Sequence, residues 1–480
     1  MSLPDLIEIV PLEKPVHAEI TVPGSKSITN RAFVLAALAD GETTLQGALW
    51  SEDTQVMVEC LQELGFMVNV APDPNEVCNR TITVYGQGGK VPRGGTVEQP
   101  LELFVGNAGT AARFLAAMVC LGEDVYRLHG VPRMHERPQA ALFQALRQLG
   151  YQIDSPNDKL PALIHGSGPK PGTKCTVSIE ESSQFASALL LGARVGGWQI
   201  SITEENAEES PYVVMTSELV KVFPHRGGQF QIEPDASSGS YFWGTGKLVE
   251  DPSVPIHLWH PQAKSPPVRL SVTVNDWPNS HWQIDAKFVQ VMVDIASRSP
   301  SFDSQLFQVE TERYGENWMS QPHIRREVEA TMIPVNVSRK DGLGDSIMTA
   351  ITLAPLAFAH FTFTELGRLR VQECERVVAL RTELTKCGAK VIEERDTLTV
   401  YPSQLHGAEI ETYNDHRMAM CFAILGLKVP GIKIKNPACV KKTFPNFFQK
   451  LAAPPPGGLG AVILEARTGR RLAMEELFAD

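Results

Sequence analysis

Residues 21–31 read Thr-Val-Pro-Gly-Ser-Lys-Ser-Ile-Thr-Asn-Arg, and an apolar stretch at 32–39 follows directly. Gly24 allows the backbone to turn, and Lys26 and Arg31 bring two cations to the start of the predicted helix. The free N–H groups of a first helical turn and the helix dipole both attract anions. The segment therefore predicts an anion-binding loop at a helix N-terminus.

The same plan, a polar or glycine-rich loop that opens a helix of small residues, recurs five more times. These loops begin at Gly106, Glu180, Asp235, Asp341 and Asn414. A strand-like run and a second amphipathic helix follow most of the loops, and a glycine is predicted just past the end of three of these helices, at Gly65, Gly150 and Gly388. We interpret the chain as six α/β units, three in each of two lobes.

The composition is that of an ordinary globular protein with room for two or three domains. The chain has 480 residues, of which 43% are hydrophobic and 21% charged. Its net charge of −11 disfavours non-specific binding to nucleic acid or to an anionic membrane, so anionic ligands require locally gathered cations. Without a signal sequence or a run of eighteen apolar residues, a cytoplasmic location is expected.

The eight cysteines are scattered, with no Cys-x-x-Cys pair and no Cys/His pattern typical of a metal site. We expect free buried thiols in a reducing compartment, and we expect the protein to bind neither a metal nor a cofactor. Proline punctuates residues 246–280, which predicts an insertion or long connection, and 453–460 reads as a linker. The sequence does not indicate a role for the closing tail, 461–480.

Six motifs carry a resemblance to one family. They are residues 23–31, 106–113, 133–138, 182–185, 413–420 and 442–445. In sequence and in order they resemble the EPSP synthase (3-phosphoshikimate 1-carboxyvinyltransferase) family, over residues 7 to about 452. The resemblance implies an α/β fold of two lobes, each built from three βαβαββ units with pseudo-threefold symmetry. The implied lobes are 21–234, and 1–20 together with 235–452, with 453–480 outside them as linker and tail.

The resemblance also implies the reaction. The family joins phosphoenolpyruvate to the 5-hydroxyl of shikimate 3-phosphate, on the route to chorismate and the aromatic amino acids, and releases phosphate. The substrates would lie in a cleft between lobes that close on them and exclude water. The implied partners are these two small molecules, without nucleic acid or membrane, and a monomer is expected.

Site residues are carried over motif by motif. Asp345 would face the 5-hydroxyl, Glu373 would be the acid and base at the methylene carbon, and Lys26 would bridge both substrates. The phosphoenolpyruvate ligands would be Lys26, Asn107, Gly109, Arg137, Gln184, Arg376, Arg417 and Lys442. The shikimate 3-phosphate ligands would be Lys26, Ser27, Arg31, Ser182, Ser183, Gln184, Tyr212, Asp345, Arg368 and Gln372. Guanidinium forks and lysine point charges suit such anions.

The chain departs from the family mainly on the shikimate side. Arg368 stands where the family has Asn, and Gln372 where it has Lys, so we expect Arg368 to supply the cation lost at position 372. Glu209 replaces a usual Ser beside the expected 3-phosphate, and His135 replaces a usual Lys. These departures leave the donor side intact and the acceptor side altered.

Several of these residues also have purely structural interpretations. Asp345 and Asp415 stand where N-cap residues occur, and Ser182 could cap a helix. Two other functions stay open. One is UDP-N-acetylglucosamine enolpyruvyl transfer. Enzymes of that family have a Lys-Asn pair in the first loop and use a cysteine in a loop as the acid. This chain has Lys26-Ser27 in the first loop, and its Cys120 lies in an apolar helix. The other is a non-catalytic or altered-acceptor paralogue that binds an anionic metabolite.

Overall fold

The computed structural model describes residues 3–203, 210–248, 271–297, 313, 321, 335–339, 342–357 and 359–479. Glu209 and most of the proline-rich 246–280 segment lie outside the described residues. Two compact units are present. Unit 1 comprises Met1–Val22, Ala236–Trp277 and Ile284–Asp480, and unit 2 comprises Pro23–Asp235 and Pro278–Gln283.

Unit 2 contains two four-stranded sheets and one two-stranded sheet among its described residues. The first has the order β12 (Gly228–Gln231), β3 (Asp40–Leu49), β5 (Asn79–Gln87), β4 (Val68–Pro72). The second has the order β6 (Leu101–Phe104), β7 (Val125–His129), β9 (Ala162–His165), β8 (Gln152–Asp154). The third pairs β10 (Lys174–Ser178) with β11 (Gln199–Thr203) in parallel.

Unit 1 repeats this composition within its described residues. One sheet has the order β14 (Val335–Ser338), β15 (Phe361–Thr364), β17 (Thr397–Val400), β16 (Val391–Glu394). Another has the order β18 (Glu409–Ile410), β19 (Ile432–Lys435), β1 (Leu6–Ile9), β20 (Ile463–Glu465). The third pairs β2 (Ala18–Ile20) with β13 (Val272–Val274) in parallel.

All four four-stranded sheets share one topology. Each has a parallel pair at one edge, followed by two antiparallel pairings. In the sheets that start with β6 and β14, the chain order of strands and helices is βαβαββ. The predicted repeat and α/β class are therefore confirmed, and the fold is the two-lobed enolpyruvyl transferase fold.

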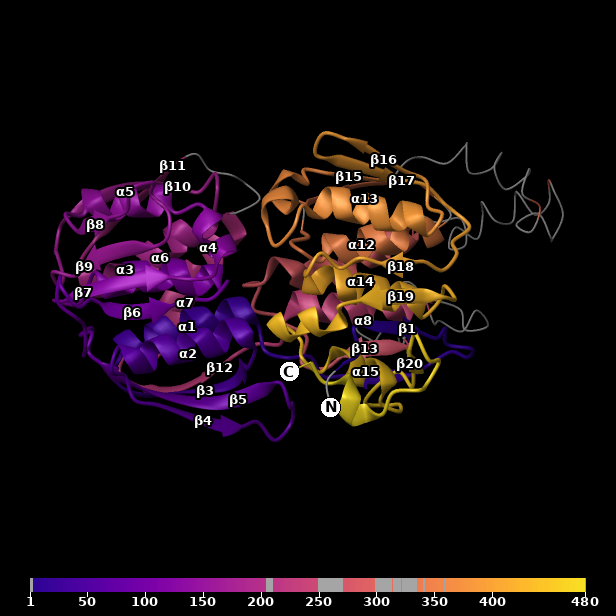
Figure 1. Ribbon diagram of the computed structural model, residues 1–480, viewed down its shortest axis with the longest axis horizontal. Helices are drawn as coiled ribbons and strands as arrows, with labels where there is room; N and C mark the ends of the chain where they lie inside the picture. Colours follow the sequence, from indigo (N-terminus) through magenta and orange to yellow (C-terminus); the bar gives the residue numbers. More distant parts are fainter. Residues whose placement is uncertain are drawn as a thin grey trace, which may run out of the picture. The chain divides into compact units, whose positions relative to one another are not determined.

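Three helices form the interior of each unit. In unit 2 they are α1 (Lys26–Leu38), α3 (Gly109–Val119) and α6 (Ser183–Gly196), and in unit 1 they are α8 (Ala236–Leu248), α12 (Ile347–Leu353) and α14 (His416–Gly426). The three helices of each set contact one another. Every residue of α3, α12 and α14 is buried, as expected for helices that are apolar on all sides. Figure 1 shows strands of unit 2, β3 to β5 and β10 to β11, on opposite sides of its inner helices.

The inner helices run in parallel, because residues at the same height touch. Arg31 of α1 donates from Nη2 to the Ser187 hydroxyl of α6 at 3.0 Å, both within five residues of their helix starts. In unit 1 the hydroxyls of Ser240 in α8 and Thr349 in α12 are 2.9 Å apart. The first turns of the three helices in each unit therefore lie together, and their N–H groups and dipoles act in the same direction.

Further helices and turns complete the units. The outer helices are α2 (Glu52–Glu63), α4 (Pro132–Glu136), α5 (Ala140–Gln148), α7 (Ser210–Val222), α9 (Phe288–Ser297), α13 (Arg376–Lys386) and α15 (Phe447–Ala452). The 3₁₀ turns are η1 (Ile284–Lys287), η4 (Ala354–Leu356), η5 (Gly367–Val371), η6 (Pro437–Lys442) and η7 (Met474–Leu477). In the described part of the chain, no helix is both long and apolar enough to cross a membrane.

The predicted glycine stops are present. Gly65, Gly150 and Gly388 follow α2, α5 and α13 with φ values of +87°, +91° and +88°. This left-handed backbone is strained for residues with a side chain, so glycine at these points ends the helix and turns the chain into the next strand.

One short segment packs with a different unit from the one the sequence suggested. We expected residues 278–283 in the lobe that begins at 235, but they belong to unit 2. The Trp282 ring stacks on Phe230 with centroids 6.3 Å apart, and the Gln283 side chain donates to the Pro234 carbonyl at 2.8 Å. Aromatic stacking and a hydrogen bond from a side chain to a backbone carbonyl, neither of which the local sequence indicates, fix this segment.

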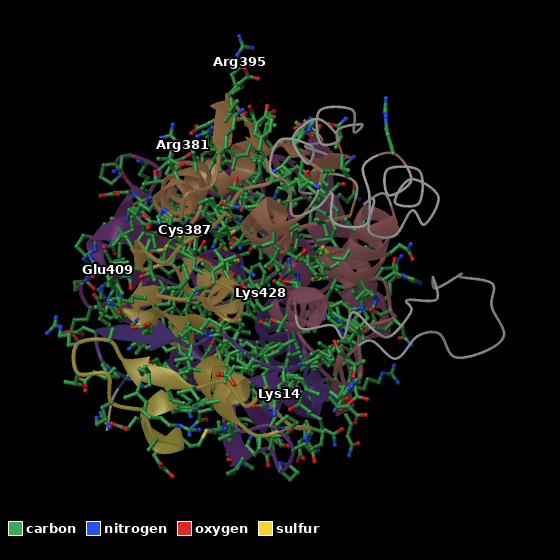
Figure 2. All side chains as sticks on the ribbon, turned by 90° about the vertical axis from the view of Figure 1, so that its right-hand side faces the viewer. Lys14, Arg381, Cys387, Arg395, Glu409 and Lys428 are labelled. Atoms are coloured by element: carbon green, nitrogen blue, oxygen red, sulfur yellow. The ribbon has the colours of Figure 1, made fainter. Side chains whose placement is uncertain are left out.

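A hairpin of unit 1 anchors the segment that leads to Glu373. Figure 2 shows Arg395 projecting from the tip of the hairpin formed by β16 and β17. From η5, Arg370 makes ion pairs with Glu393 at 2.8 Å and with Asp396 at 2.9 Å, both on this hairpin. It also pairs with Glu375 at 2.5 Å, so one guanidinium ties the η5 segment to the hairpin and to the start of α13.

The tail, whose role the sequence did not indicate, supplies a strand. β20 pairs antiparallel with β1, and Ile463 lies opposite Ile9. In the shared topology, β20 takes the edge position that β4, β8 and β16 take in the other sheets. Leu459, Ile463 and Leu477 are each 1% exposed, so the tail also adds apolar side chains to the core of unit 1.

We expect disruption of the tail strand to destabilise unit 1. Ile463→Asp places a charge in the core opposite Ile9 and should lower the melting temperature by at least about 8 °C, the scale of several kcal/mol in a domain of this size. Arg467→Asp, on the exposed turn after β20, is the matched control and should leave the melting temperature within about 2 °C. Differential scanning calorimetry measures both, and equal melting temperatures for the two variants would contradict a core role for the tail.

Candidate active site

The predicted site residues gather at the starts of the inner helices and on the turns beside them. Unit 2 carries Lys26, Ser27, Arg31, Asn107, Gly109, Arg137, Ser182, Ser183, Gln184 and Tyr212. Unit 1 carries Asp345, Arg368, Gln372, Glu373, Arg376, Arg417 and Lys442. Because the inner helices are parallel, each unit presents three helix N-termini on one side, which is an arrangement suited to anions.

Lys26 is the first residue of α1. Its ammonium forms an ion pair with Asp53, in the first turn of α2, at 3.2 Å. The Lys26 side chain is 19% exposed and that of Asp53 only 7%. The N-cap residue of α1, Ser25, makes no side-chain capping hydrogen bond to the described residues, so the first turn keeps N–H groups available to a ligand. The sequence did not indicate Asp53 as the partner of Lys26.

Arg31 is buried deeper than the sequence suggested, with 2% of its surface exposed. Its guanidinium donates to the Thr216 hydroxyl at 2.7 Å and to the Ser27 carbonyl at 2.9 Å, and it lies over the Phe114 ring. Burial lowers the pKa of Arg31 to about 10, although the nearby Tyr212 opposes this shift. Arg31 stays charged at neutral pH and joins α1 to α6 and α7; its contact with shikimate 3-phosphate stays a prediction.

The start of α3 is shaped around Arg137. The guanidinium of Arg137 donates to the Asn107 carbonyl at 3.0 Å. A Cβ atom on Gly109 would lie 2.6 Å from Arg137 Nη2 and 2.7 Å from its Cζ. Only glycine therefore allows this guanidinium to approach the helix start. The Asn107 Oδ1 atom is buried without a hydrogen-bond partner in the described residues, which leaves an acceptor beside the cation.

Gln184, in the first turn of α6, is held by a residue that the sequence did not single out. Arg113 of α3 donates to Gln184 Oε1 at 2.6 Å and to the Pro138 carbonyl at 3.2 Å. The Gln184 amide donates to the Thr110 hydroxyl at 3.3 Å. Arg113 thus connects Gln184 to the turn that follows Arg137.

The two serines before Gln184 also have structural roles. Ser182 is the N-cap of α6, and its hydroxyl accepts from the Gln184 N–H at 3.3 Å. The capping interpretation of Ser182 is therefore confirmed, and its contact with a substrate stays a prediction. Both Ser182 and Ser183 are buried, and Tyr212 lies in the first turn of α7.

Asp345 lies among three arginines of unit 1. Its carboxylate is 3.0 Å from Arg417 Nε, 3.5 Å from Arg376 Nη1 and 3.8 Å from Arg339 Nη2. Burial alone would raise the pKa of the Asp345 carboxyl, but these three cations hold it well below its usual range, against an opposing contribution from Glu373. Asp345 is therefore ionised at neutral pH, and the stability that this carboxylate contributes is lost only as the pH falls below the ordinary range of an aspartate.

Glu373 shares a cation with Asp345. The Glu373 carboxylate is 2.8 Å from Arg376 Nη2 and 3.4 Å from Lys442 Nζ. Since Arg376 Nη1 also contacts Asp345, one guanidinium holds both carboxylates. The Glu373 side chain is 17% exposed and that of Asp345 15%, whereas Arg376 is fully buried. Two carboxylates on one buried arginine, with a lysine beside them, form the centre of the unit 1 site.

Asp415 holds the guanidinium of Arg376 in place. Its carboxylate accepts from Arg376 Nε at 2.7 Å and from the Arg417 N–H at 2.8 Å, so it is the N-cap of α14, as the structural interpretation proposed. Burial alone would lower the pKa of Arg376, but the carboxylates of Asp415, Glu373 and Asp345 raise it well above its usual range. Arg376 is thus a permanent cation.

Two of the three departures on the shikimate side, Arg368 and Gln372, lie in the segment that precedes α13. Gln372 accepts a hydrogen bond from Arg376 Nη1 and donates to Asp345 Oδ1 at 3.4 Å. Gln372 therefore joins Arg376 to Asp345. Arg368 lies in η5, and the idea that it replaces the lost cation stays a prediction.

Among the described residues, no group of three or more His, Cys, Asp or Glu side chains is arranged to hold a metal ion. All eight cysteines are free thiols.

The chain resembles known proteins over nearly its full length. Residues 10–226 and 267–451 match the family model of EPSP synthase (3-phosphoshikimate 1-carboxyvinyltransferase). A 3-phosphoshikimate 1-carboxyvinyltransferase of Nostoc punctiforme is 32% identical, over 93% of this chain and 98% of its own length. One from Yersinia pseudotuberculosis is 35% identical, over 91% of this chain and 96% of its own length.

A solved structure agrees at the level of the fold. EPSP synthase from Acinetobacter baumannii superimposes with a TM-score of 0.63 and 18% identity, over 92% of this chain and 97% of that one. The tail strand β20 lies beyond the last residue matched by the family model, 451.

Proposed function

Because the chain belongs to the EPSP synthase family, we propose that it transfers the enolpyruvyl group of phosphoenolpyruvate to the 5-hydroxyl of shikimate 3-phosphate. The products are 5-enolpyruvylshikimate 3-phosphate and phosphate. The observation that carries the chemistry is the buried Arg376 guanidinium, which contacts the carboxylates of both Asp345 and Glu373. Addition followed by elimination needs two groups that move protons, and this arrangement holds two.

The two carboxylates take different steps. Asp345 accepts the proton of the 5-hydroxyl as its oxygen bonds to C2 of phosphoenolpyruvate, and Glu373 delivers a proton to the methylene carbon. Glu373, now a carboxylate, then takes a proton back from the methyl group of the intermediate as the C2–O bond to phosphate breaks, so that the C=C bond forms again and phosphate leaves. The carboxylate of Glu373 contacts Lys442 at 3.4 Å and Arg376 at 2.8 Å, two cations of the proposed phosphoenolpyruvate set, which supports a place for Glu373 beside that substrate.

The substrate-binding residues are proposed from the family resemblance. Phosphoenolpyruvate is bound by Lys26, Asn107, Gly109, Arg137, Gln184, Arg376, Arg417 and Lys442. Shikimate 3-phosphate is bound by Lys26, Ser27, Arg31, Ser182, Ser183, Gln184, Tyr212, Asp345, Arg368 and Gln372. The close approach of Arg137 to Gly109 supports the first set, because it brings a fork of donors to the N-terminus of a buried helix.

The alternatives have less support. UDP-N-acetylglucosamine enolpyruvyl transfer would need a cysteine as the acid. Burial raises the pKa of the Cys120 thiol well above its usual range. This thiol, at the C-cap of α3, donates a hydrogen bond to the Ala116 carbonyl. A non-catalytic paralogue would not need both Asp345 and Glu373. We further propose that the protein acts as a cytoplasmic monomer.

A phosphate-release assay tests the proposed reaction. Purified protein with both phosphoenolpyruvate and shikimate 3-phosphate should release one phosphate per enolpyruvyl transferred, whereas either substrate alone should release none. Shikimate without its phosphate is the matched control and should react at least about a hundredfold more slowly, since it lacks the charge-assisted contacts. Phosphate release that requires UDP-N-acetylglucosamine, or no release with any acceptor, would overturn the assignment.

A further inference from the structure

A second buried carboxylate lies directly behind Asp345. Asp285 is in η1, is 3% exposed and belongs to none of the substrate sets above. Its Oδ1 atom accepts from the Gly344 N–H at 2.7 Å and from the Ser346 N–H at 3.1 Å. The Ser346 hydroxyl donates to the same oxygen. One oxygen of Asp285 therefore binds the backbone on both sides of Asp345.

The other oxygen of Asp285 ties this loop to an inner helix. The Ser237 hydroxyl, in the first turn of α8, donates to Asp285 Oδ2 at 2.6 Å. A Cβ atom on Gly344 would lie 2.9 Å from Oδ2 and 3.2 Å from Oδ1, so glycine is needed for the loop to come this close. Three segments, α8, η1 and the turn before α12, are thus joined through one carboxylate.

The position of these bonds bears on the direction of the Asp345 side chain. The bond to the Ser346 N–H restrains the peptide plane directly after Asp345, and the bond to the Gly344 N–H restrains the plane between residues 343 and 344, one residue earlier. Together they limit the direction of the Cα–Cβ bond of Asp345. Asp345 must reach Arg417, Arg376 and Arg339 at 3.0–3.8 Å, and small errors in position weaken both ion pairing and proton transfer. A bond to charged oxygen is also stronger than one to a neutral acceptor.

We propose that Asp285 is a positioning residue for the reaction: its carboxylate holds the Gly344–Ser346 turn so that Asp345 faces the reacting hydroxyl. This inference rests on the proposed function, because it assumes that Asp345 acts in catalysis. Asp285 itself moves no proton and touches no substrate. Its loss should therefore lower kcat more than it weakens substrate binding.

Asp285→Ala is the first test. Removal of all four hydrogen bonds should lower kcat by at least about thirtyfold and leave KM for phosphoenolpyruvate within about threefold of wild type. Asp285→Asn keeps one carbonyl oxygen for the two N–H groups, and its amide can donate to Ser237, so kcat should recover to within about fivefold of wild type.

Ser237→Ala is the matched structural control. It removes the hydrogen bond to Oδ2 but leaves every bond between Asp285 and the Asp345 turn. We expect a lower melting temperature with kcat within about twofold of wild type. If Ser237→Ala lost as much kcat as Asp285→Ala, the effect would come from general packing and the positioning role would be refuted.

Gly344→Ala keeps the test decisive if Asp285→Ala does not fold. The added methyl group pushes the turn away from Asp285 without altering either carboxylate, and kcat should fall at least about tenfold with KM nearly unchanged. An unchanged kcat in Gly344→Ala, with Asp345→Ala inactive, would overturn the positioning role alone. An active Asp345→Ala would instead overturn the catalytic assignment on which the inference rests.

Discussion

Lys26→Ala should lower kcat/KM for phosphoenolpyruvate by at least about a thousandfold while the protein stays folded. Lys26 begins α1, where the N–H groups of the first turn and the ammonium act together on an anion. The charge that develops as the enolpyruvyl group adds and phosphate leaves is stabilised by such a fixed cation, and alanine removes it. Phosphate release measured over a range of phosphoenolpyruvate concentrations gives the ratio directly.

Asp53 makes a control for this experiment. In Lys26→Ala the buried carboxylate of Asp53 loses the ion pair that it forms at 3.2 Å, and this defect alone could disturb α1 and α2. The double variant Lys26→Ala with Asp53→Ala removes the unpaired charge and should be as inactive as the single variant. Lys90→Ala, on the exposed surface of the same unit, should keep full activity. Recovery of turnover in the double variant, or a loss of less than about tenfold in Lys26→Ala, would contradict a direct role for the ammonium.

The repeating fold was predictable because its signals are local. A polar loop before a run of small residues marks the start of each inner helix, and the glycines after α2, α5 and α13 mark helix ends with positive φ. The tail was not predictable in the same way. β20 is three residues long and pairs with β1 at the opposite end of the chain, so its place depends on a contact that no local pattern encodes.

In the candidate site, too, residues in characteristic local segments could be predicted, and partners from distant segments could not. The family resemblance assigned roles to Lys26, Asp345, Glu373 and Arg376, and these roles stay predictions. Their partners Asp53, Asp285 and Arg339 lie in other segments and were missed. Side chains that meet only after folding have no characteristic spacing in the sequence. An acidic residue just before an apolar helix is the one signal that could have pointed to Asp285.

The charges around Asp345 determine its strength as a base. With Arg417, Arg376 and Arg339 at 3.0–3.8 Å, the pKa of Asp345 lies far below neutral pH, and such a carboxylate is a poor proton acceptor. Bound phosphoenolpyruvate would place its own negative charges on Arg376 and Arg417. These charges offset the cations and raise the pKa of Asp345, so the base becomes stronger when the substrate is bound.

Asp345→Ala and Glu373→Gln should each lower kcat by at least about a hundredfold, the scale of a general acid or base. Asp345→Ala also frees Arg417 and Arg376 from a competing carboxylate, so KM for phosphoenolpyruvate should stay the same or fall. Glu373→Gln keeps the shape of the side chain and an oxygen for Arg376 and Lys442, so binding should change little while proton delivery is lost. Steady-state kinetics with both substrates varied separates kcat from KM.

Glu375→Gln is the matched control for these carboxylates. Glu375 lies two residues beyond Glu373, caps α13 by accepting from the Val378 N–H at 2.6 Å and pairs with Arg370, and its side chain is 38% exposed. Its neutralisation should lower stability slightly and leave kcat within about twofold of wild type, because its contacts are structural. If Asp345→Ala or Glu373→Gln changed only KM, that residue would be a binding group. The proton would then have to move through another side chain, for which Lys26 is the remaining candidate among the charged groups at the described helix starts.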